Sequence, residues 1–89
     1  MDVRTIRRTV LEGLEAGAVA KAGNVDFHAA FLDGTIDIRL ADLDMDSLAK
    51  MEVCIAIEVG TGVSLAPEEL DRYATLAELV AAIEERSRA

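Results

Sequence analysis

The sequence has few of the residues that would support a disulfide framework or an aromatic core. It contains one cysteine, one proline and no tryptophan, and only 3% of its residues are aromatic. A single cysteine excludes an internal disulfide, which fits a reducing, cytoplasmic location. The 89 residues are 52% apolar, which suffices for one small domain whose core is aliphatic.

Basic residues are also scarce. There are 9 Lys and Arg against 17 Asp and Glu, which gives a net charge of −8. Nucleic-acid binding and attachment to an anionic membrane surface both need positive charge, so neither is expected. Residues 42–89 hold eleven of the acids and only four of the bases. This uneven distribution indicates that residues 42–89 carry an acidic functional surface, which would suit partners with basic patches.

Long hydrophobic runs are missing as well. Charged residues interrupt the N-terminal stretch "MDVRTIRRTVLEGL" every few positions, so we expect neither a signal peptide nor a membrane span there. In that stretch Val3, Ile6, Val10 and Leu14 follow steps of three and four residues. This spacing predicts an amphipathic helix.

The whole pattern predicts an all-α fold, a small four-helix bundle within a single domain over residues 1–89. It has three principal helices, a short third helix and a long loop between the first and second helices. Gly60 is placed to cap the second helix, and Thr75 with Glu78 forms a capping box for the last. The predicted ranges are about 2–18 (helix I), 19–46 (loop), 47–59 (helix II), 67–72 (helix III) and 76–86 (helix IV).

The first connection has the least regular pattern. It allows an ordered loop with a helical turn near 27–32, and a short strand at 35–38 is the alternative. His28, the only histidine, has no second histidine or cysteine nearby, so we expect no metal site there.

The stretch "DLDMDSL" at 42–48 crowds three carboxylates beside a serine. One interpretation is a calcium loop, but such a loop needs glycine at position six and glutamate at position twelve, where this chain has Ser47 and Val53. A second interpretation is helix capping, which needs only one such residue. The third is that Ser47 is an attachment point. Met51 and Ile55, four and eight positions later, lie on its side of the helix, and Leu48 adjoins it.

The segments "DLDMDSLAKMEVCIAIEVGTGVSL" and "ATLAELVAAI" resemble the acyl carrier protein family. The resemblance depends on Leu43 in the loop, on Asp46-Ser47-Leu48 at the helix start, and on the acidic helices that follow. It implies a free-standing carrier with no enzyme activity. Ser47 would receive a 4′-phosphopantetheine arm from coenzyme A through a separate, magnesium-dependent phosphopantetheinyl transferase. The arm's thiol would hold acyl groups as thioesters, and Asp46 would support the attachment.

The resemblance also implies a partner-recognition surface and core positions on helix II. Val53, Cys54 and Ile57 would face the core. The partners would be acyl-loading, condensing or tailoring enzymes with basic patches, and the carrier would act as a monomer. The implied recognition residues are Asp42, Asp44, Leu48, Met51, Glu52, Ile55 and Glu58.

Three departures from the family pattern bear on the pathway. Asp44 stands where glycine is usual after the loop leucine, Lys50 places a positive charge within the recognition surface, and the first loop is longer than in compact fatty-acid carriers. These features favour a specialised pathway, of the polyketide or a related secondary-metabolite type. The alternatives are a peptidyl or aminoacyl carrier, and an acidic helical adaptor without a prosthetic group.

Overall fold

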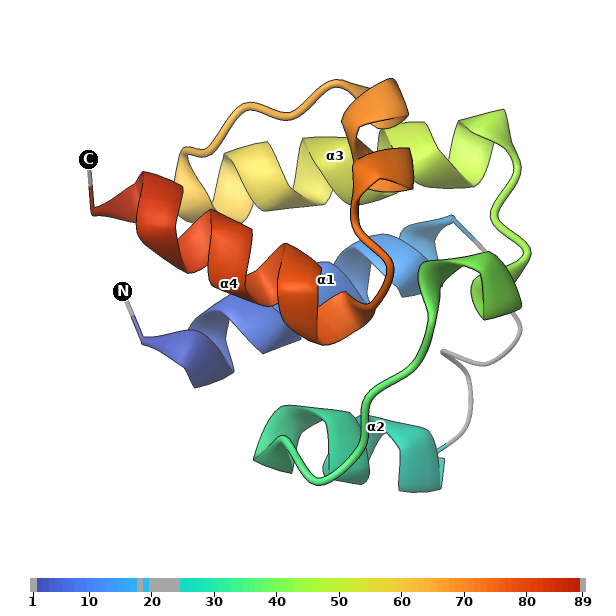
Figure 1. The fold of residues 1–89 in the computed structure, drawn as a ribbon, viewed down its shortest axis with the longest axis vertical. Coiled ribbons are helices and arrows are strands. Elements are labelled where there is room, and N and C mark those ends of the chain that lie inside the picture. Colours follow the sequence, from blue (N-terminus) through green and yellow to red (C-terminus); the bar gives the residue numbers. More distant parts are fainter. Residues whose placement is uncertain (1, 18, 20–24, 89) are drawn as a thin grey trace.

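The computed structural model describes residues 2–17, 19 and 25–88, which form helices joined by turns (Figure 1). These ranges contain one isolated bridge, between Arg39 and Thr75, and no strand. The all-α prediction is therefore confirmed, and the alternative strand at 35–38 is wrong. The elements are α1 (Val3–Ala16), α2 (Val25–Asp33), α3 (Ser47–Thr61), α4 (Leu76–Ser87) and the short 3-10 helices η2 (Leu40–Leu43) and η3 (Pro67–Arg72).

The ends of the helices follow local capping chemistry. Asp2 caps α1 by accepting a hydrogen bond from the Thr5 amide at 2.7 Å. The helix closes at Ala16, and residue 18, at the end of the predicted range, lies outside the described residues. The expectation that Gly60 caps the second helix is wrong. The helix α3 continues to Thr61, and the cap is Gly62, whose positive φ of 77° suits glycine.

The most extensive helix contact joins α1 to α3, and glycine makes it close. A Cβ on Gly13 would lie 2.8 Å from the Cα of Val53, and a Cβ on Gly60 would lie 2.6 Å from Thr9 Cγ2. The two backbones therefore approach more closely than larger side chains would allow. Aliphatic side chains from α1, α3 and α4 make up most of the core. The buried residues among them include Ile6, Val10, Leu14, Ile57, Leu76, Leu79 and Ile83.

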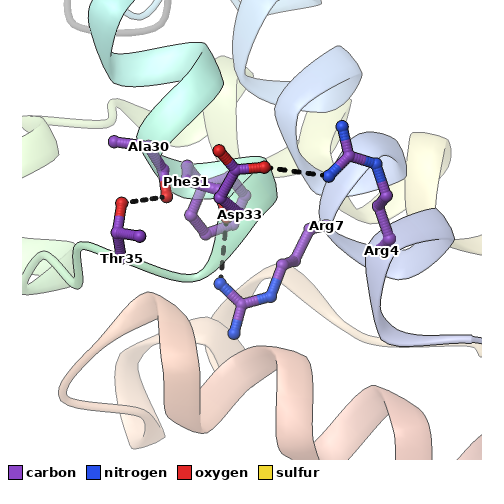
Figure 2. A network of polar contacts seen from close by, with 6 residues as sticks. All are labelled: Arg4, Arg7, Ala30, Phe31, Asp33 and Thr35. Atoms are coloured by element: carbon purple, nitrogen blue, oxygen red, sulfur yellow. Dashed lines mark hydrogen bonds and ion pairs between the residues drawn. The ribbon is translucent and has the colours of Figure 1, made fainter.

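The first connection contains a helix that the sequence pattern only hinted at. In the helix α2, Phe31 is buried, and it stacks with Phe27 at a centroid distance of 5.9 Å. Arg7 of α1 donates a hydrogen bond to the Phe31 carbonyl at 2.9 Å and lies over the Phe31 ring (Figure 2). Arg4 pairs with Asp33 at 3.0 Å in the same network. Polar and aromatic contacts thus hold α2 against α1.

The rest of this connection is tied to the start of α4. The Leu40 amide donates to Ala74 O, and the Leu76 amide donates to Ile38 O, both at 2.9 Å. The Asp37 carboxylate accepts a hydrogen bond from the Ala77 amide at 3.0 Å. The predicted capping box between Thr75 and Glu78 is present. These bonds fix the segment that leads through η2 to the start of α3.

Replacing Gly13 with alanine should destabilise the fold. The new Cβ would collide with the Val53 backbone, which cannot rotate away. We expect a loss of about 1–3 kcal/mol in the free energy of unfolding, measured by urea denaturation. Glu12→Ala, at an exposed position of the same helix, is the control and should change that free energy by less than about 0.5 kcal/mol. Equal effects of the two variants would contradict the close packing.

Candidate functional site

The segment before α3 alternates between buried and exposed side chains. Leu43 is buried and Met45 half-buried, whereas Asp42, Asp44 and Asp46 are exposed. The two apolar residues anchor the segment to the core, so the carboxylates point outward. Asp42 pairs with Arg39 at 3.2 Å.

Asp44 has an unusual backbone conformation. Its φ of 51° and ψ of 42° lie in the left-handed region, where a side chain is unfavourable. Glycine has no Cβ and adopts this region freely. The turn after η2 therefore explains why glycine would suit this position, which is one of the places where the sequence departs from the family pattern.

Ser47 is the first residue of α3, and it is exposed. Asp46 caps the helix by accepting a hydrogen bond from the Ala49 amide at 2.8 Å. The cap thus comes from Asp46, and the Ser47 hydroxyl has no hydrogen-bond partner among the described residues. It is available for modification at a helix N-terminus, where a negatively charged group such as a phosphate is favoured.

One side of α3 exposes an apolar strip, defined here as Leu48, Met51, Ile55 and Val59. Their exposed fractions are 63%, 48%, 52% and 83%. Val53, Cys54 and Ile57 are buried on the other side, where they were expected. Glu58 is exposed and Glu52 half-buried. Val59 was not among the predicted recognition residues, although it continues the four-residue step from Met51 through Ile55.

Adjoining clefts lie beside η3, where it faces α3 and the segment before α3. The cleft beside Ser47 has a volume of about 340 Å³ and is lined by Ser47, Lys50, Met51, Pro67, Glu68 and Asp71. A cleft of about 180 Å³ adjoins it toward Glu58 and Leu65, and one of about 420 Å³ adjoins it toward Leu40 and Tyr73. These clefts could not be predicted from residue spacing, because η3 follows α3 only after a turn and then folds back along it.

Contacts with two other helices hold η3 in place. Leu70 is buried, and Lys50 Nζ pairs with Asp71 Oδ1 at 2.8 Å. Arg86 of α4 pairs with Glu69 at 3.0 Å. The Ala66 amide and then Arg86 donate hydrogen bonds that lower the pKa of Glu69. The Glu69 contribution to stability is therefore present above the unfolded pKa and is lost as the pH falls through the folded pKa.

The remaining candidate residues do not form a second site. Cys54 is buried, and burial raises the pKa of its thiol. His28 Nε2 lies 3.2 Å from Glu15 Oε1, a contact between α2 and α1. Within the described part of the chain, no group of three or more His, Cys, Asp or Glu residues could hold a metal ion. Across the same residues, no helix is both long and apolar enough to span a membrane.

The helical fold places the chain among small all-α helical bundles. Comparison with protein families identifies the family to which it belongs. The model of the phosphopantetheine attachment site family matches residues 29–83, more than half of the chain, so the chain belongs to this family. Its members attach 4′-phosphopantetheine covalently, which makes this chain a phosphopantetheine-bearing carrier protein. The match favours the carrier over the adaptor hypothesis.

The other two comparisons gave no relative. Neither the search of curated proteins nor the search of solved structures found a match.

Replacing Asp44 with glycine should stabilise the protein. Removing the Cβ relieves the left-handed conformation, by up to about 1 kcal/mol in the free energy of unfolding. Asp44→Ala is the matched control, since it removes the carboxylate but keeps the Cβ. We expect the glycine variant to have a higher free energy of unfolding than the alanine variant, measured by urea denaturation. The reverse order would contradict the strain assigned to Asp44.

Proposed function

We propose that Ser47 carries the 4′-phosphopantetheine arm. The observation that supports this most directly is its hydroxyl at the first residue of α3, which is exposed and has no hydrogen-bond partner within the described part of the chain. Ser47 also lies inside the region that matches the family. Ser64 also lies in that region and is exposed, but it is in the turn between α3 and η3 and is not the first residue of a helix.

The residues around Ser47 suit an attached phosphodiester. The N-terminus of α3 favours the negative charge, and Asp46 keeps the helix start in place by capping it. We propose that Asp46 also helps to position Ser47 in the complex with a magnesium-dependent transferase. The arm supplies a terminal thiol, which holds the cargo as a thioester.

We further propose that the apolar strip and the acids around it form the docking surface for partner enzymes. Exposed apolar side chains grouped along one helix are typical of interaction sites. The proposed acids are Asp42, Asp44, Glu52 and Glu58, which would attract basic patches and give fast, reversible association. Tethering raises the local concentration of the cargo at each partner, and the partner performs the bond chemistry.

For the cargo, we propose an acyl group in a specialised, polyketide-type pathway. The acid directly before Ser47 and the long first connection, which holds α2, support this class over a peptidyl carrier or a compact fatty-acid carrier. The loaded chain should accept acyl groups from acyltransferases and no aminoacyl groups from adenylating enzymes. Efficient aminoacyl loading would contradict the proposed class.

Incubation with coenzyme A, magnesium and a promiscuous phosphopantetheinyl transferase should add the mass of one arm. The gain should be absent in Ser47→Ala and kept in Ser64→Ala, the control at an exposed serine. Loading should also create one fast-reacting thiol, because the buried Cys54 thiol with its raised pKa reacts slowly. A full mass gain in Ser47→Ala would overturn the assignment.

Replacing Met51 with glutamate should weaken transfer of the cargo to a partner without unfolding the protein. The side chain is 48% exposed, so the free energy of unfolding should change by less than about 0.5 kcal/mol. Loss of a docking anchor should lower kcat/KM for transfer roughly tenfold. Ala81→Glu adds the same charge at an exposed position of α4 and should leave transfer unchanged. Unfolding of the Met51 variant would place this residue in the core instead.

A further inference from the structure

Lys50 has a position that the docking role leaves unexplained. It lies on α3 between two of the clefts, and it lines both the cleft beside Ser47 and the larger one toward Tyr73. Its side chain is 28% exposed, and Nζ lies 2.8 Å from Asp71 Oδ1. Lys50 is therefore held in the groove between α3 and η3, at its contact with η3.

The other charged residues that line the cleft beside Ser47 are negative. Glu68 and Asp71 line the same cleft, and Asp46 directly precedes Ser47. A phosphodiester on Ser47 would add another negative charge to this group, and like charges at close range repel. Among the described residues that line the three clefts, Lys50 is the only base.

The geometry of the helix brings Lys50 and Ser47 to one side. Residues three apart are neighbours on a helix surface, and both of these side chains line the 340 Å³ cleft. An ammonium group has three N–H donors. The contact with Asp71 uses one of them, which leaves two donors for a second anion.

We propose that Lys50 binds the phosphodiester that joins the arm to Ser47. The inference depends on the proposed function of Ser47 and makes Lys50 a positioning residue, which forms no covalent bond. The ammonium offsets the new charge and holds the first atoms of the arm beside the α3–η3 cleft. Hydrogen bonds between a charged amine and a phosphate are among the stronger ones in proteins.

The test is the ³¹P resonance of the chain loaded with the arm. Lys50→Gln should shift this resonance from its wild-type position by more than the line width. Lys50→Arg keeps the charge, so its resonance should lie close to the wild-type position. Arg39→Gln is the matched control. It removes one positive charge at an exposed site that lines none of the three clefts, and it should leave the resonance in place.

A second measurement follows the amine itself. The sequence has two lysines, Lys21 and Lys50, so the ¹⁵N-labelled ammonium spectrum has a second signal as internal reference. Loading should shift the Lys50 signal in the wild type, and Ser47→Ala treated in the same way should show no shift. Mass spectrometry of each sample reports loading separately.

Loading of Ser47 without any response of the ³¹P resonance to Lys50→Gln would overturn the role of Lys50 and leave the carrier function standing. The same follows if Arg39→Gln shifts the resonance as much as Lys50→Gln does. A chain that is not loaded on Ser47 would overturn both proposals. Amide spectra of the variants establish that each one keeps the fold.

Discussion

The close approach of α1 and α3 is the contact on which the site depends. Gly13 lets the backbone of α1 meet that of α3 at Val53, and Gly60 lets α3 meet Thr9 of α1. With one side of α3 pressed onto α1, its other side is left to carry Ser47 and the apolar strip. The exposure of the site thus depends on the tight packing of α3 against α1. This packing fixes which side of α3 faces the solvent.

The second constraint fixes where α3 begins. The segment before it is bonded to the start of α4 at Leu40 and Leu76, and Leu43 is buried just after. Asp44 then turns the chain through a left-handed conformation, and Asp46 caps the helix. Two anchored ends and one turn between them place a single hydroxyl at a defined point. Such placement would suit the proposed attachment point of the arm.

Local signals in the sequence were enough to predict most of the helices. The apolar spacing of α1 and the capping box of Thr75 and Glu78 are properties of neighbouring residues, so they can be recognised without a structure. The helix α2 was seen only as a possible turn, because its apolar residues do not follow one face and Phe31 is fixed by Arg7 from another helix. The exposed side of α3 followed from spacing, whereas the clefts depend on how η3 folds back, which spacing does not reveal.

The apolar strip on α3 has a consequence for the behaviour of the protein at high concentration. Four exposed apolar side chains on one helix would ordinarily favour sticking of one copy to another. Here most of the net charge of −8 comes from the half of the chain that carries the strip. Like charge repels across the approach of two copies. The same acids that would attract a basic partner therefore oppose self-association of the protein through the apolar strip. Binding through the strip is then favoured only with positively charged surfaces.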